Sequence, residues 1–138
     1  MAEMNARQIA KAVTHSDSPF SLKKNDAVIE NVSYGMFSWG EADLIALTKA
    51  GYMIEGEIKI SLQDLRADLK KTKWVDDNYK AWCRDIKQFY YIVPSGLVEE
   101  ALKITDKAII EAFITKSGGY ASRIHRASVA YGNQRGRK

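Results

Sequence analysis

Two strand-like runs joined by a short turn limit most strongly what this chain folds into. The first run is Glu41–Thr48, the second is Tyr52–Ile60, and Lys49–Gly51 connect them. A three-residue hairpin loop needs one residue in the left-handed conformation, which glycine adopts without a steric penalty. Gly51 meets that need, so the pattern predicts a β-hairpin.

The position of the loop also predicts the register of this hairpin. The opposed pairs that follow are Asp43 with Glu57, Glu41 with Lys59, and Ile45 with Glu55. In residues 52–60 the even positions are nearly all apolar, whereas the odd positions become charged towards the end of the run. Because side chains alternate between the two faces of a strand, we expect one core face and one polar, solvent-exposed face.

Hydrophobic spacing and turn residues predict the remaining elements. The expected helices are about 5–14, 62–73 with Ser61 as N-cap, a short one carrying Tyr79 to Ile86, and one after Pro94 capped by Ser95. The expected strands outside the hairpin are about 27–34, 88–93, 110–115 and 120–129, with a Gly118-Gly119 turn between the last two. This order predicts an α/β fold with a mixed central sheet flanked by helices.

Size and composition restrict the class of protein. The chain has 138 residues, 46% apolar and 28% charged, which suits one globular domain over 1–132, and we expect 133–138 to be a basic C-terminal tail. Cys83 is the only cysteine and His15 and His125 lie far apart, which argues against a disulfide scaffold, a zinc site or a Cys/His nucleophile. No apolar stretch is long enough to cross a bilayer, so we expect a cytoplasmic protein without a membrane partner.

Basic residues gather at the C-terminal end. Six of the 21 Lys and Arg residues lie in 112–138, a stretch without Asp or Glu: Lys116, Arg123, Arg126, Arg135, Arg137 and Lys138. Such a stretch supplies phosphate neutralisation in nucleic-acid binding, although a solvated basic tail explains it equally well.

The predicted register brings two carboxylates together. Asp43 directly opposite Glu57 is repulsive unless a cation lies between them or one of them is protonated. The two carboxylates and the backbone carbonyl of Ile58 provide the oxygen ligands that Mg²⁺ prefers, and Mn²⁺ would substitute for it. Lys59, on the same face, would orient a water and offset charge on a phosphodiester. The alternative is a cross-strand ion pair between Lys59 and Glu41 on an exposed face.

Three segments carry a family resemblance. Trp39–Thr48, Glu55–Ser61 (continuing through Asp64, Asp68 and Lys70-Lys71) and Phe89–Leu97 resemble the PD-(D/E)xK nuclease superfamily, and look most like the small bacterial and phage MmcB-like DNA-repair nucleases. The resemblance runs from roughly Val28 to Leu102. Ala42 stands where the motif often has proline. Gln88 and Tyr91 lie in an expected strand, so the Gln-x-x-x-Tyr helix motif of the RecB-like branch is absent.

This resemblance implies a restriction-endonuclease-like αβββαβ core, to which the C-terminal hairpin is added. It implies Asp43 and Glu57 as metal ligands, Lys59 as the third catalytic residue, and a Mg²⁺-dependent deoxyribonuclease, expected to be an endonuclease, that leaves 5′-phosphate and 3′-hydroxyl ends. Two rival functions stay open, a catalytically inactive nucleic-acid-binding module with the same fold and a protein-interaction domain. The form of the substrate and the existence of a homodimer also stay open.

Other residues are weaker candidates. Glu41 and Glu55 are possible additional ligands, although Glu55 is expected rather to solvate the polar face. Basic residues that could contact phosphates are Lys70, Lys71, Lys73, Arg123, Arg126, Arg135, Arg137 and Lys138. The helix at 62–73 carries charges of both signs, including Asp68, which is typical of an exposed helix side. His125 is expected to be a sheet residue rather than a general base.

Overall fold

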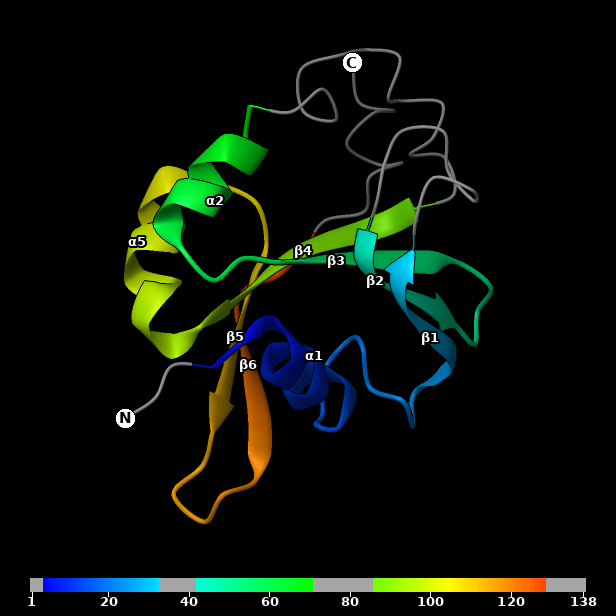
Figure 1. Cartoon of the computed structure of the whole chain (residues 1–138). Helices are drawn as coiled ribbons and strands as arrows, with labels where there is room; N and C mark the ends of the chain where they lie inside the picture. Colours follow the sequence, from blue (N-terminus) through cyan, green and yellow to red (C-terminus); the bar gives the residue numbers. More distant parts are fainter. Residues whose placement is uncertain (1–3, 33–41, 71–85, 129–138) are drawn as a thin grey trace.

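The described part of the chain forms one six-stranded sheet with helices on both faces (Figure 1). The structure is a computed structural model, and it describes residues 4–32, 42–70 and 86–128. In chain order the elements are α1 (Ala6–Thr14), β1 (Asn25–Val32), β2 (Ala42–Thr48), β3 (Met53–Ile58), α2 (Leu62–Asp68), β4 (Ile86–Pro94), the 3₁₀ turn η2 (Ser95–Leu97), α5 (Val98–Ile104), β5 (Ile109–Ile114) and β6 (Tyr120–Arg126). The predicted α/β class, with a mixed sheet flanked by helices and a C-terminal hairpin, is confirmed.

The strands follow one another across the sheet in sequence order. Neighbours are antiparallel from β1 to β3, parallel from β3 to β5, and antiparallel again between β5 and β6. Parallel neighbours need a crossover connection, which α5 provides between β4 and β5. The change from antiparallel to parallel pairing therefore falls on β3, which carries Glu57 and is followed directly by Lys59.

The predicted hairpin and its register are confirmed. Ile45 pairs with Glu55 and Leu44 with Gly56, as the three-residue loop requires. Gly51 has φ 95°, in the left-handed region. Its N–H donates to the carbonyl of Thr48, which closes the turn.

Each face of the sheet has its own hydrophobic core. On one face, α1 packs Ile9 and Val13 against even-numbered strand residues such as Ile54. On the other face, Leu65 of α2 and Val98 of α5 pack against odd-numbered strand residues. Figure 1 shows α1 below β3 and β4, and α2 and α5 together on the opposite side.

The expectation of an exposed polar face on β3 is therefore wrong. Glu55 is 2% exposed and Glu57 is 5% exposed, because the odd face of the sheet also has a hydrophobic core. Alternating charge along a strand does not distinguish a solvent face from one that lies under helices. The predicted solvation role of Glu55 is wrong for the same reason.

Several element boundaries differ from the prediction. The helix after the hairpin ends at Asp68 rather than near 73, and β3 ends at Ile58. Ile86 begins β4 instead of belonging to a helix, and the rest of that expected helix, 79–85, lies outside the described residues. Ser95 does not cap the following helix, because its hydroxyl donates to the carboxylate of Glu111.

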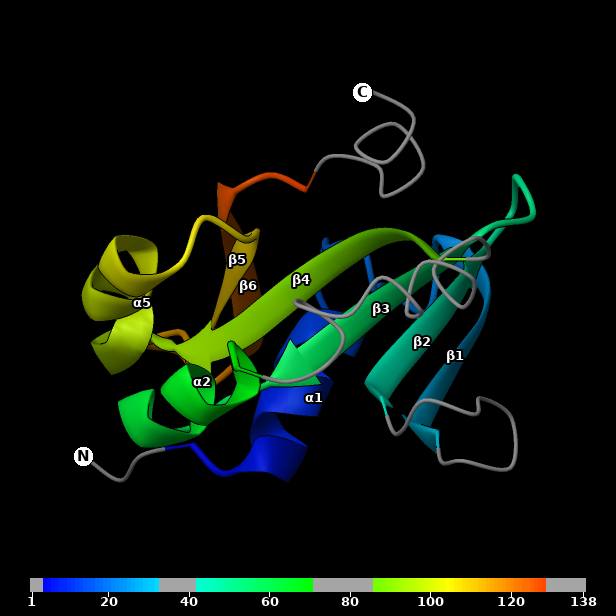
Figure 2. The ribbon, with the colours of Figure 1, turned by 90° about the horizontal axis from the view of Figure 1, so that it is seen from above.

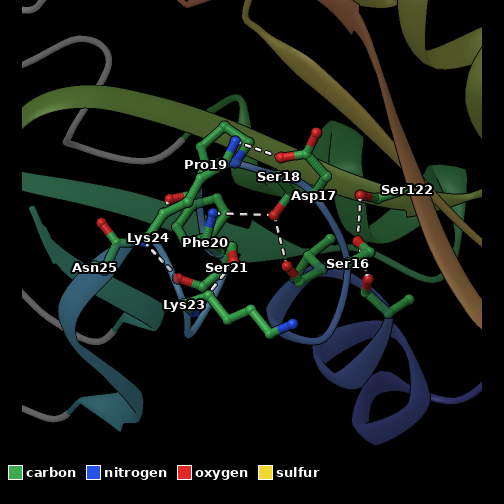
Figure 3. Close-up of polar contacts among 12 residues, drawn as sticks. Ser16, Asp17, Ser18, Pro19, Phe20, Ser21, Lys23, Lys24, Asn25 and Ser122 are labelled. Atoms are coloured by element: carbon green, nitrogen blue, oxygen red, sulfur yellow. Dashed lines mark hydrogen bonds and ion pairs between the residues drawn. The ribbon is translucent and has the colours of Figure 1, made fainter.

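The loop between α1 and β1 is held by serine and asparagine side chains (Figure 3). The Ser18 hydroxyl bonds to the Val13 carbonyl at 2.5 Å and accepts from the N–H of Phe20 at 3.0 Å. The Asn25 side chain donates to the carbonyls of Pro19 and Ser21, each at 2.9 Å. These local bonds satisfy the backbone of a segment that has no regular structure, and they direct Phe20 into the core.

Phe20 explains the glycine at the centre of β3. A Cβ on Gly56 would lie 2.7 Å from Cζ of Phe20 and 2.9 Å from Cδ1 of Ile92. Real side chains do not approach so closely, so only glycine fits here without displacing the ring. Gly56 lies between Glu55 and Glu57, and the packing of Phe20 thus constrains the strand that carries both carboxylates.

Candidate functional site

The candidate site begins where the β2–β3 ladder ends. The last pair of the two strands is Leu44 with Gly56, and a continued antiparallel ladder would next join the N–H of Ile58 to the carbonyl of Ala42. Instead, the N–H of Ile58 donates to Oδ2 of Asp43 at 2.7 Å. The half-buried Asp43 carboxylate thus replaces a backbone acceptor at the end of β3.

Lys59 follows Ile58 directly and is held by ion pairs. Its Nζ lies 3.3 Å from Oδ1 of Asp68 and 3.8 Å from Oε1 of Glu57. Its N–H bonds to the carbonyl of Ile92 on β4, so the main chain is also fixed. The Lys59 side chain is only 12% exposed. The alternative prediction, an ion pair between Lys59 and Glu41 on an exposed face, is therefore wrong about the exposure of Lys59. Glu41 itself lies outside the described residues.

Asp68 is a site residue whose helix carries charges of both signs, a pattern that predicted an exposed position. It is completely buried, and besides Lys59 it accepts a hydrogen bond from the Tyr91 hydroxyl at 2.5 Å. The last turn of α2 places it there: Ser61 caps the helix, and Leu65, three residues before Asp68, packs in the core. Residues three apart share a helix face, so the spacing from Leu65 was a signal that Asp68 lies on the buried side.

The site thus brings the three predicted catalytic residues to one end of the sheet. Asp43 comes from β2, Glu57 from β3, and Lys59 from the residue after Ile58. Figure 2 shows the tip of β3 beside α2, the helix that supplies Asp68. Glu55 lies one strand repeat before Glu57 on the same face and is buried.

These donors fit a hard cation. Asp43, Glu57 and the carbonyl of Ile58 offer only oxygen, the ligand type of Mg²⁺, which is commonly bound through one or two carboxylates and several waters. Within the described segments, no group of three or more Asp, Glu, His or Cys side chains could hold a metal ion. An ion held by Asp43, Glu57 and the Ile58 carbonyl would complete its shell with water.

A second polar cluster surrounds Glu111 on β5. Its carboxylate contacts the ring Nε2 of His125 at 2.7 Å, Nη1 of Arg123 at 3.4 Å and the hydroxyl of Ser95. Burial alone would raise the pKa of Glu111, but the hydrogen bonds from His125 and Ser95 and the charge of Arg123 outweigh it and lower that pKa below 4.5. His125 lies in β6, as the sequence predicted.

The predicted phosphate-contacting residues divide into three groups. Arg126 donates to the carbonyls of Leu102, Thr105 and Lys107, so its guanidinium holds the end of α5 and the following loop. Lys70 and Arg123 are exposed, and the Arg123 guanidinium also lies 5.0 Å from the centre of the Phe113 ring. The others lie outside the described residues: Lys71, Lys73, Arg135, Arg137 and Lys138.

No family model and no curated protein matches this chain. None of the helices in the described segments is both long and apolar enough to cross a membrane. A similar solved structure is the SPO1766 protein of unknown function from Silicibacter pomeroyi, with a TM-score of 0.52 and 16% sequence identity. The match covers 75% of this chain and 60% of that chain, and at this identity it supports the α/β fold alone.

Proposed function

We propose that this protein is a Mg²⁺-dependent nuclease that hydrolyses phosphodiester bonds in nucleic acid, with DNA as the expected substrate. The observation that carries the proposal is the end of the β2–β3 ladder, where Asp43 accepts from the N–H of Ile58 beside Glu57 and Lys59. Two carboxylates and one ammonium at one strand end are the groups that metal-assisted phosphodiester hydrolysis needs. The resemblance of the same residues to the PD-(D/E)xK motif supports the assignment.

Each residue has a defined role in this reaction. Asp43, Glu57 and the carbonyl of Ile58 would hold the ion, which when bound supplies an activated water and neutralises charge on the phosphate. Lys59 stabilises the negative charge that develops on the phosphate oxygens in the transition state. Its low exposure strengthens that interaction, because the surrounding water that would screen the charge is largely excluded.

The second candidate function is a nucleic-acid-binding module without catalysis. Its support is the ion pairing of Lys59 with Asp68 and Glu57, since a purely structural network would make the same contacts. The two candidates differ in turnover, not in binding.

The test compares wild type with Asp43→Asn on labelled linear, nicked, branched and single-stranded DNA, with Mg²⁺, Mn²⁺ or EDTA. Asparagine keeps an oxygen that accepts from Ile58, so the strand end stays intact while one ligand charge is lost. Asp26→Asn is the matched control, because Asp26 lies on a surface strand and pairs only with Lys49 among the described residues, at 3.6 Å.

We expect Mg²⁺-dependent cleavage by wild type and by Asp26→Asn, and a loss of about 10²- to 10³-fold in Asp43→Asn. Mg²⁺ should also raise the free energy of unfolding of wild type by RT ln(1 + [Mg²⁺]/Kd), and with it the melting temperature, and both rises should be smaller in Asp43→Asn. Salt-dependent DNA binding without cleavage would select the binding module. An equal Mg²⁺ response in all three proteins would exclude Asp43 as a ligand.

A further inference from the structure

The Asp68 carboxylate has a partner at each of its two oxygens. One oxygen forms an ion pair with the ammonium of Lys59, and the other accepts a hydrogen bond from the hydroxyl of Tyr91. The distances are 3.3 Å from Lys59 Nζ to Oδ1 and 2.5 Å from the Tyr91 oxygen to Oδ2. A carboxylate bound at both oxygens cannot rotate without breaking a contact. Asp68 is also fully buried, and charge-assisted hydrogen bonds are strongest where water is excluded.

Tyr91 is itself fixed in place. It lies in the middle of β4, pairs with Glu57 on β3 and with Ile109 on β5, and is fully buried. Its ring meets that of Phe89 edge to face, with the centroids 4.8 Å apart. The hydroxyl therefore reaches Asp68 from a rigid central strand, and the Tyr91–Asp68 contact joins this strand to α2.

We propose that Asp68 and Tyr91 are positioning residues that fix the Lys59 ammonium at the end of β3. The proposal rests on the nuclease function proposed above, because the position of Lys59 matters for catalysis only in that function. An ammonium has three N–H groups, and the carboxylates of Asp68 and Glu57 both lie within ion-pair distance of it. Holding the long lysine side chain in one rotamer before the substrate arrives removes an entropy cost from the reaction.

This arrangement predicts that altering Asp68 or Tyr91 affects the cleavage rate and the DNA affinity differently. A Lys59 side chain that moves freely still attracts phosphate, so DNA affinity should change little when Asp68 or Tyr91 is altered. The cleavage rate should fall, because misplacement of a catalytic group by about 1 Å costs up to about 10²-fold. A merely structural contact would change the melting temperature without this difference.

The experiment uses Asp68→Asn and Tyr91→Phe in the full chain, with Tyr90→Phe as the matched control. Tyr90 is the next residue of the same strand and is also buried, but it belongs to the core on the opposite face. All three substitutions preserve side-chain size closely. Three quantities are measured: the order parameter of the Lys59 NH₃⁺ group by ¹⁵N relaxation, the rate of single-turnover cleavage, and the DNA affinity in EDTA.

In wild type we expect Lys59 to be more ordered than Lys103, which is 63% exposed and lies 3.6 Å from Glu100. Asp68→Asn should lower the Lys59 order parameter towards that of Lys103 and slow cleavage about 10- to 100-fold with affinity kept within about threefold. Tyr91→Phe should act in the same direction to a smaller extent, and Tyr90→Phe should match wild type.

An unchanged Lys59 order parameter in both Asp68→Asn and Tyr91→Phe would overturn the proposal, and so would unchanged cleavage. If Asp68→Asn does not fold, Tyr91→Phe, which leaves the buried carboxylate paired with Lys59, decides the question alone. If wild type cleaves no DNA, the nuclease function fails, whereas the order parameters still decide whether Asp68 and Tyr91 hold Lys59.

Discussion

Replacing Lys59 by methionine should destabilise the fold far more than the same change at a surface lysine. Methionine keeps the apolar stem and removes the charge, so the loss reports the ion pairs rather than packing. In wild type the ammonium lies 3.3 Å from Asp68, whose side chain is fully buried, and 3.8 Å from the nearly buried Glu57. The variant leaves the Asp68 carboxylate buried without this counter-charge.

The burial of the partners determines the expected size of the effect. Removing one partner of a buried ion pair costs about 3–5 kcal/mol, whereas an exposed pair contributes about 0–1 kcal/mol. Tyr91 still donates to Asp68 in the variant, so we expect the lower end, about 3 kcal/mol. In a domain of this size that corresponds to a fall in melting temperature of roughly 10 °C.

The assay is urea unfolding followed by circular dichroism, with Lys103→Met as the matched control. Lys103 pairs with Glu100 at 3.6 Å, but both side chains are largely exposed, so its loss should cost at most about 1 kcal/mol. A Lys59→Met, Asp68→Asn double variant should recover much of the lost free energy, since the buried carboxylate that lost the Lys59 counter-charge is replaced by a neutral amide. Two results would contradict this expectation: a loss in Lys59→Met no larger than that in Lys103→Met, or a loss in the double variant equal to the sum of the two single losses.

Three further predictions concern other parts of the chain. Gly56→Ala should lower the free energy of unfolding by about 1–3 kcal/mol through collision with Phe20, and should cost less in a Phe20→Leu background; a double-mutant cycle in urea measures this. The lowered pKa of Glu111 stabilises the fold above the unfolded-state pKa of 4.5, and this contribution is lost as the pH falls through the lower folded-state pKa. As the pH falls below about 4.5, the stability of wild type should therefore decline more steeply than that of Glu111→Gln, in acid unfolding followed by circular dichroism. Deleting Asn133–Lys138 removes three basic residues and should reduce the salt slope of DNA binding by up to about 3, measured by fluorescence anisotropy; an unchanged slope would leave the tail solvated.

Local sequence signals predicted the backbone of the site well. The loop at Gly51 and the alternation of apolar residues predict the register that opposes Ile45 and Glu55. Continued one residue beyond the last pair, Leu44 with Gly56, this register places Asp43 level with Glu57. Turn chemistry acts over a few residues, so it is readable without knowledge of the rest of the fold. The cap at Ser61 was predictable for the same reason.

The surroundings of the site were not predictable in the same way. Whether Glu57 faces solvent depends on the core that forms over the odd face of the sheet. The residue pattern within the strand does not indicate whether helices will cover that face. Charged residues are rarely buried, so the same reasoning assigned Asp68 to the exposed side of its helix. The Ser95 hydroxyl likewise bonds across the sheet to Glu111 instead of capping its own helix, because a tertiary partner outcompetes the local one.

The burial of these charges favours a functional reading of the site over a purely stabilising one. Desolvating Lys59, Glu57 and Asp68 is costly, and apolar side chains of similar size often replace buried ion pairs without loss of stability. Stability alone therefore gives little reason for an ammonium held between two carboxylates. A second feature that packing does not require lies at the end of β3, where the N–H of Ile58 donates to the Asp43 carboxylate instead of to a backbone carbonyl. A Lys59→Met, Asp68→Asn protein that folds and binds DNA yet does not cleave it would separate the two contributions directly.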